Sequence, residues 1–223
     1  MDADEVARYL KDNPQFFEQY AELLSGVTLT HPHGGHSIPL MERQVLALRE
    51  RGRALEGKLA ELIGFGEEND AIGEKMHRLA LALLAAPALD AVLGALYFHL
   101  RDDFRIPHAA LRSWLARPEQ AGTRPEFASV SDELKQLAAG LVQPFCGASQ
   151  NAEAAAWFGD AAEHVRSVAF MPLREAGAAG IEGACIGMLA LGSEDAERFY
   201  PEMGTVYLKR LGELASAALA RLL

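Results

Sequence analysis

The clearest pattern of hydrophobic and polar positions in the chain is a seven-residue repeat between residues 41 and 62. Its members recur at alternating four- and three-residue intervals: Met41, Val45, Leu48, Gly52, Leu55, Leu59 and Leu62. This spacing is typical of the a and d positions of a coiled coil. Charged residues of both signs occupy many of the positions between them, as on a solvated flank. We therefore predict a coiled-coil helix over residues 39–70 that pairs with a second copy of itself.

Residues 1–38 are predicted to form a helical arm and a connector. Asn13 and Pro14 separate two short helices, because asparagine is a good N-cap and proline suits the first helical position. The second helix is too short to bury its aromatic face alone, so it must dock on the rest of the chain or on a second copy. The connector holds His31, His33 and His36, which could in principle ligate zinc. No cysteine or carboxylate lies between residues 27 and 39, and we predict a tight loop and no metal site.

Residues 71–223 are predicted to form one domain in which helical periods give way to strand alternation. After the glycines at 64 and 66, helicity resumes in a segment that ends at Pro87, and another helix follows over residues 89–104. Residues 108–115 alternate as a strand that places Leu111 on one face and Trp114 on the other. We then expect a loop at 118–125, a helix at 131–141, a brief strand or turn at 144–147 and a helical or irregular stretch at 150–163.

The stretch from Ser167 to Ser193 reads as two apolar strands joined by a loop that contains glycine. Its second strand is apolar on both faces, which places it centrally in a sheet that is covered on both sides. One closing helix follows, with a second seam at four- and three-residue spacing: Leu208, Leu211, Ala215, Ala218 and Leu222. We expect this seam also to meet its symmetry mate, so that the homodimer uses both.

Composition and charge narrow the classes of function. The chain has 223 residues, is 50% hydrophobic and carries a net charge of −10, which makes nucleic acid or an anionic membrane an unlikely partner. Residues 52–58 match the start of a phosphate-binding loop, but Leu59 replaces the required Ser or Thr and no strand precedes them. The chain opens MDADE, holds two cysteines and has no apolar run long enough to cross a bilayer, so we expect a cytoplasmic protein.

Several segments carry a family likeness, in this order: VARYLKDNPQFF, Leu-Thr-His-Pro-His, PLMERQVLALRER, Glu68-Asn69-Asp70, LVQPFCG and SVAFMPL. Together they resemble the DUF484 family of uncharacterised bacterial proteins, for which no activity is established. The strand, loop and strand ending in LALGS, with Phe199 and Pro201 before the last helix, resemble a GAF domain. That resemblance implies an antiparallel sheet with helices on both faces, which binds small molecules or mediates dimerisation. It implies sensing or regulation rather than catalysis.

The sequence departs from two functional patterns of GAF domains. Cyclic-nucleotide-binding members carry NK followed by F-x-x-x-D-E, whereas the spacing from Phe127 to Asp132-Glu133 is one residue too long and NK is missing. Members that reduce free methionine sulfoxide use three cysteines, and this chain has two. Neither ligand nor reaction is therefore carried over.

Candidate ligand contacts are the residues that would line a GAF-type pocket between sheet and helices: Trp114, Phe145, Cys146, Phe170 and Met171. The alternative is that these side chains are simply core, since apolar strand residues are usually buried. Cys146 with His164 is the one cysteine–histidine pairing considered for catalysis, but QPFCG places no basic neighbour next to the thiol. No GxSxG motif is present. We predict no catalytic residue and no cofactor.

These observations predict an α+β protein: N-terminal helices and a long coiled-coil helix, followed by a GAF-like antiparallel sheet with helices on both faces. The predicted function is that of a non-enzymatic dimeric regulatory or sensory protein that binds a small molecule or a protein partner. The alternative is an adaptor with a filled core and no ligand, which holds a partner, such as a nucleic-acid enzyme, through the N-terminal helices. A thiol enzyme that uses Cys146 is a third hypothesis, and no motif supports it.

Overall fold

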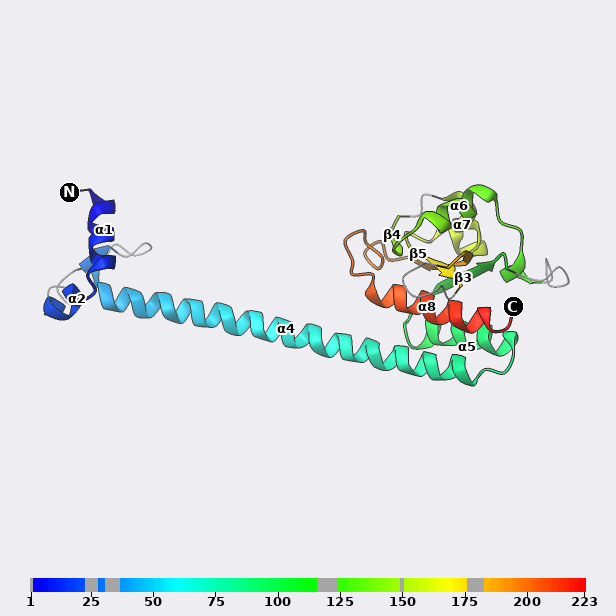
Figure 1. Ribbon diagram of the computed structural model, residues 1–223, viewed down its shortest axis with the longest axis horizontal. Helices are drawn as coiled ribbons and strands as arrows, with labels where there is room; N and C mark the ends of the chain where they lie inside the picture. The colour runs from blue at the N-terminus through cyan, green and yellow to red at the C-terminus, as the bar shows by residue number, and fades with distance from the viewer. Residues whose placement is uncertain (1, 23–27, 31–36, 116–123, 149–150, 176–182) are drawn as a thin grey trace. The chain divides into compact units, whose positions relative to one another are not determined.

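The computed structural model describes residues 2–22, 28–30, 37–115, 124–148, 151–175 and 183–223 (Figure 1). These residues divide into two compact units, Met1–Glu67 and Glu68–Leu223. Helix α4, Leu40–Ala85, contributes its residues 40–67 to the first unit and its residues 68–85 to the second.

The first unit begins with the two predicted short helices, α1 (Ala3–Asp12) and α2 (Gln15–Gln19). Asp2 caps α1, and the Glu5 carboxylate accepts a hydrogen bond from the Asp2 backbone N–H at 3.0 Å, which completes a capping box. The connector differs from the predicted loop, because β1 (Thr28–Thr30) and β2 (Ser37–Pro39) pair antiparallel within it. His31, His33 and His36 lie outside the described residues.

Helix α4 confirms the long helix but corrects its predicted interruption near residues 64–66. Glycine lowers helix propensity by about 1 kcal/mol relative to alanine without forbidding helical backbone angles. No proline occurs between Leu40 and Ala85, so the ladder of backbone hydrogen bonds continues across these glycines. Residues 52–58 lie within the helix, which leaves no phosphate-binding loop there.

The second unit is built on an antiparallel sheet whose described strands have the order β3-β6-β5-β4. They are β3 (His108–Ser113), β4 (Phe145–Gly147), β5 (Ser167–Arg174) and β6 (Cys185–Ser193). Figure 1 shows α5 (Leu89–Asp102) and α8 (Val206–Ala220) on one face of this sheet, and α6 (Asp132–Gly140) and α7 (Ala152–Ala156) on the other. Two short 3-10 helices, η1 (Pro125–Phe127) and η2 (Gly159–Glu163), complete the unit. The predicted α+β class is confirmed.

The central hairpin β5–β6 supplies the core on both faces, as its double apolar pattern predicted. Met171 and Leu189 oppose each other across the two strands and belong to the apolar cluster with α5 and α8. Their neighbours Phe170 and Ala190 also oppose each other and belong to the cluster with α6 and α7. Alternation along the strand therefore divides the interior into two layers.

Helix α8 is where the prediction of a second dimer seam is wrong. Leu208, Leu211, Ala215 and Ala218 are buried within the chain itself, in the cluster that includes α5 and β5, and Leu222 packs against that cluster. A four-and-three spacing fits a helix that packs on a sheet as well as a coiled coil, and here the sheet takes the apolar face.

Gly187 on β6 tests the close approach of the strands. A Cβ at this position would lie 2.5 Å from the carbonyl oxygen of Arg112 on β3, so Gly187→Ala must displace backbone. We expect a loss of about 1–3 kcal/mol in the free energy of unfolding, measured by urea denaturation.

Gly94→Ala on α5 is the matched control for that substitution. An added Cβ at Gly94 meets no atom within 4 Å, so this variant should gain about 0.5–1 kcal/mol from helix propensity. Equal stability of the two variants would contradict the described strand packing.

Candidate functional site

The five predicted ligand contacts lie on two faces of the sheet. Trp114, Phe145 and Phe170 belong to the cluster with α6 and α7, whereas Cys146 and Met171 belong to the cluster with α5 and α8. Consecutive strand residues point to opposite faces, so Phe145 and Cys146 cannot line one pocket, nor can Phe170 and Met171. The sequence-based expectation that all five residues line one pocket is therefore wrong, because they divide between the two faces of the sheet. Contact of either group with a ligand stays a prediction.

The three aromatic residues are held by packing and by one backbone hydrogen bond. Phe145 pairs with Phe170 across β4 and β5, and their rings stack with centroids 5.8 Å apart. The indole N–H of Trp114 donates to the carbonyl oxygen of Cys185 at 2.7 Å. Phe170 is 3% exposed. In this arrangement the three rings serve as core.

The two thiols lack the environment of an activated nucleophile. Burial raises the pKa of Cys146 to about 11, and burial also raises the pKa of Cys185 against the opposing effects of a backbone hydrogen bond at Gly187 and of Arg174. Both thiols therefore stay protonated at neutral pH. Among the described hydrogen bonds, none joins Cys146 to His164.

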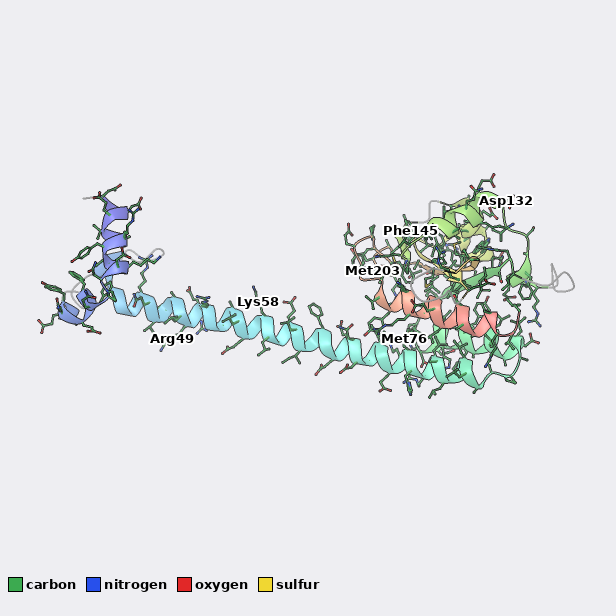
Figure 2. The ribbon with its side chains drawn as sticks, in the orientation of Figure 1. Arg49, Lys58, Met76, Asp132, Phe145 and Met203 are labelled. Atoms are coloured by element: carbon green, nitrogen blue, oxygen red, sulfur yellow. The ribbon has the colours of Figure 1, made fainter. Side chains whose placement is uncertain are left out.

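A groove of about 460 Å³ opens in the second unit, on the side of the sheet that α5 and α8 cover. We refer to it as the α4–α8 groove. It lies between the part of α4 in this unit, the turn from α5 to β3, the loop after β6 and the start of α8. Its lining is mainly apolar: Ala71, Ile72, Met76, Phe104, Ile106, Phe199, Met203, Gly204, Tyr207, Leu208 and Leu211. Met76 and Met203, labelled in Figure 2, come from α4 and from the loop before α8.

The floor of the α4–α8 groove is rigid core, whereas its rim is partly exposed. Ile106, Phe199 and Leu211 are 5% exposed or less and belong to the cluster with α5 and α8. Met203 and Tyr207 at the rim are only partly buried against that cluster. The groove therefore offers an exposed apolar surface on a well-packed base.

Charged residues border the groove unevenly. Lys75 and Arg198 carry positive charge and Glu68 carries negative charge. Arg198 donates from Nη2 to the carbonyl oxygen of Phe104 at 2.9 Å, which ties the loop after β6 to the end of α5. Tyr207 donates from its hydroxyl to the carbonyl oxygen of Asn69 at 3.1 Å, which ties the start of α8 to α4.

A second, shallower depression of about 560 Å³ adjoins this corner and shares Ile106 and Arg198 with the groove. Arg101 and Arg105 line it, together with Glu194 and Asp195. Arg105 adopts a positive φ of 56° just after α5, where the next N–H, that of Ile106, donates back to Leu100 at 2.9 Å. A positive φ of this size is the left-handed region that glycine adopts most readily, and here an arginine adopts it two residues after the C-cap Asp103.

The first unit contributes an exposed apolar stripe on α4, which we call the α4 stripe. Val45, Leu48, Leu55, Leu59 and Leu62 are 43% to 67% exposed. A row of exposed apolar side chains of this length, interrupted at Gly52, is unusual on a free surface. Met41, the first member of the predicted seam, has a side chain outside the described set.

Sequence reasoning missed the α4–α8 groove because four separate segments build it. Ile72 and Met76 belong to the helix that was expected to end at Pro87, and Leu208 and Leu211 belong to the predicted dimer seam. Nothing in the local pattern showed that these two faces meet. The remaining lining comes from two turns whose course depends on tertiary packing.

The described residues hold neither a metal-ion cluster nor a membrane-spanning helix. No group of three or more histidine, cysteine, aspartate or glutamate side chains in that part of the chain could hold a metal ion. None of its helices combines the length and the apolar character that a membrane span requires.

The fold described above is that of a helical arm followed by an α+β domain with an antiparallel sheet. The chain belongs to the family described as "Protein of unknown function, DUF484", which it matches over residues 1–223. No curated protein matches it.

Two solved structures similar to this chain are GAF domains, the class that its sequence resembles. One is from a phosphoenolpyruvate-protein phosphotransferase of Coxiella burnetii, with a TM-score of 0.49 and 14% sequence identity. The match covers 67% of the present chain and 93% of the Coxiella GAF domain chain. The other is from an Acinetobacter phosphoenolpyruvate-protein phosphotransferase, with a TM-score of 0.44, 14% identity and the same coverage of 67% and 93%. No ligand or activity follows from likeness at this level.

The environment of Cys146 predicts a thiol that reacts slowly in the folded protein. Burial stabilises the neutral thiol of Cys146 over its thiolate. The contribution of this thiol to the free energy of unfolding is therefore fully present below pH 9.0, its ordinary pKa. It is lost as the pH rises toward about 11, the pKa in the folded protein. With Cys185 replaced by alanine, labelling of Cys146 by a disulfide reagent at neutral pH should be far slower in buffer than in urea. Rapid labelling of the folded protein would contradict this account and revive a thiol enzyme.

Proposed function

We propose that the protein is a dimeric regulatory protein in which the α4 stripe pairs with the same stripe of a second copy and the C-terminal domain binds a small molecule. The exposure of Val45, Leu48, Leu55, Leu59 and Leu62 carries the proposal. Covering a leucine side chain contributes about 1.5–3 kcal/mol, so a stripe of this length favours association. The second copy fits it because the repeat is self-complementary.

The sequence of the α4 stripe favours a parallel pair. Val45 occupies an a position and Leu48, Leu55 and Leu62 occupy d positions, whereas the other a positions hold Gly52 and Leu59. A β-branched residue at a with leucine at d is the combination that favours two parallel strands, and Val45 with Leu48 provides it. Arg51 then falls at a g position and Glu56 at the following e position. In a parallel pair these two charges face each other across the interface, and their attraction supports the register.

The α4–α8 groove supports the regulatory part of the proposal. Its volume of about 460 Å³ lies within the range of small-molecule sites. It is lined by residues 68–76 of α4 and by the start of α8. A ligand there would contact the same helix that carries the α4 stripe, and this is the physical basis on which binding could influence dimerisation.

Replacing two leucines of the α4 stripe by aspartate should convert the dimer to a monomer. In Leu55→Asp/Leu59→Asp, two buried apolar contacts per copy become desolvated carboxylates, which no paired helix tolerates. Size-exclusion chromatography with light scattering should report half the mass of the wild type. Ala54→Asp/Ala60→Asp, which changes the same helix off the stripe, should stay dimeric. A monomeric wild type at high micromolar concentration would refute the dimer.

The orientation of the pair can be tested by cross-linking. With Cys146 and Cys185 replaced by alanine, Leu48→Cys should form an intermolecular disulfide on mild oxidation, because a parallel pair places this d position opposite itself. Arg51→Glu should weaken the dimer and Arg51→Glu/Glu56→Arg should restore it. A dimer that resists cross-linking at residue 48 would indicate an antiparallel pair.

A second candidate function is an adaptor, and the aromatic cluster of α1 and α2 favours it. Phe16 stacks on Tyr20 with ring centroids 4.8 Å apart and meets Tyr9 edge-on at 6.5 Å. Tyr9, Phe17 and Tyr20 are 39% to 53% exposed, so this face has room for a partner. Deletion of residues 1–38 separates the two functions, because an adaptor would lose its partner whereas a ligand sensor would keep its ligand.

A further inference from the structure

We propose that the α4–α8 groove binds a medium-chain carboxylate, with the apolar chain along the groove and the carboxylate at the end marked by Arg198 and Lys75. The proposal rests on the small-molecule part of the proposed function and names the class of ligand. It does not require the dimer. Three observations carry it: the apolar lining, the placement of charge, and the size of the space.

The apolar lining suits an alkyl chain better than a polar metabolite. Ile106, Phe199 and Leu211 form a floor that is almost fully buried, and none of their side chains can hydrogen-bond. Met76 and Met203 flank this floor. Methionine side chains adapt to irregular apolar ligands because they are unbranched and have three rotatable bonds.

The contacts of neighbouring residues place both cations at one end of the groove. Arg78, one turn beyond Lys75 on α4, pairs with Asp103 at 3.1 Å. Phe104, the next residue, accepts the hydrogen bond from Arg198. Arg198 and Lys75 therefore flank the same end, where the turn after α5 meets α4.

The acidic residue of the rim lies at the opposite end. Tyr207 bonds to Asn69, next to Glu68, so the start of α8 marks that end. Glu68 and Lys75 are separated by about 10 Å along the helix axis. An extended amphipathic anion can thus place its carboxylate beside the cations and keep only its chain near Glu68.

The guanidinium of Arg198 is suited to hold a carboxylate. It has five N–H donors in a planar fork, and the hydrogen bond to Phe104 uses one of them. That bond fixes the head group at the edge of the groove. Arg101 and Arg105 in the adjoining depression are balanced by Glu194 and Asp195 of the same lining, and Arg101 pairs with Asp102 at 3.1 Å, so the carboxylate is assigned to Arg198 and Lys75.

The size of the groove favours a small molecule over a protein segment. A volume of about 460 Å³ suits a small ligand, whereas a specific protein partner covers about 800 Å² of surface on each side. On α4 and α8 the groove is lined by residues 68–76 and by the first residues of α8, which are short stretches of both helices.

The test is calorimetric titration of the full-length protein with decanoate, with decanamide and butanoate as comparison ligands. Decanoate should bind to the wild type. Decanamide, which lacks the charge, and butanoate, which lacks the chain, should each bind at least about tenfold more weakly. Absence of decanoate binding would overturn the proposal, and equal binding of decanamide would overturn the assignment of Arg198 and Lys75 to a carboxylate.

Variants locate the site. Gly204 lines the groove, and a Cβ built there meets no atom within 4 Å, so Gly204→Leu should fill the space and abolish decanoate binding without disturbing the core. Gly140→Leu, at an equally open glycine of α6, should bind as the wild type does. Arg198→Gln should weaken decanoate about tenfold and leave decanamide unchanged. Wild-type affinity in Gly204→Leu and Arg198→Gln would exclude the groove.

The Leu55→Asp/Leu59→Asp variant separates this inference from the dimer. Both substitutions lie in the first unit, whereas the α4–α8 groove lies in the second. If the monomeric variant retains decanoate binding, ligand binding in the α4–α8 groove is supported independently of the dimer. A dimeric wild type that fails to bind decanoate would overturn the ligand and leave the dimer standing.

Discussion

The second unit depends on one constraint, the apolar character of both faces of the hairpin β5–β6. A strand that is apolar on alternate residues needs one cover, whereas Ser167–Arg174 and Cys185–Ser193 need two. Helices α5 and α8 supply one cover and α6 and α7 supply the other (Figure 1). The position of the α4–α8 groove follows from this, because α8, one of the covering helices, is also a wall of the groove.

The two covers differ in what they leave open. The aromatic side chains Trp114, Phe145 and Phe170 fill the layer beneath α6 and α7. On the other side, residues 68–76 of α4 and the start of α8 line the α4–α8 groove together with Ile106 and Phe199. A regulatory function that uses this groove places the ligand on the same side of the sheet as residues 68–85 of α4.

The sequence predicted those features that depend on local periodicity. The central hairpin, the faces of β3 and the long helix α4 follow from alternation and from the heptad repeat, and the structure confirms them. Helix α8 was misassigned as a dimer seam because Leu208 and Leu211 have the same spacing whether they meet a sheet or another helix. Cys146 and Met171 were grouped with Phe145 and Phe170 because the resemblance to a GAF domain indicated which strands lie near a pocket. It did not indicate which face of the sheet each residue points to. The groove was not predictable, since its four segments meet only through tertiary contacts.

The two ends of helix α4 differ in stability, although the helix is continuous. Gly52, Gly57, Gly64 and Gly66 all lie within residues 40–67, and each costs about 1 kcal/mol relative to alanine. Residues 68–85 offset such losses with buried side chains at Met76, Leu79 and Leu83, whereas the described side chains of residues 43–67 are not buried within the chain. Amide hydrogen exchange should therefore change sharply along a single helix, slow on the domain side and fast toward the arm. The stability of α4 therefore falls along its length, and residues 40–67 become cooperatively ordered only when a partner covers the α4 stripe.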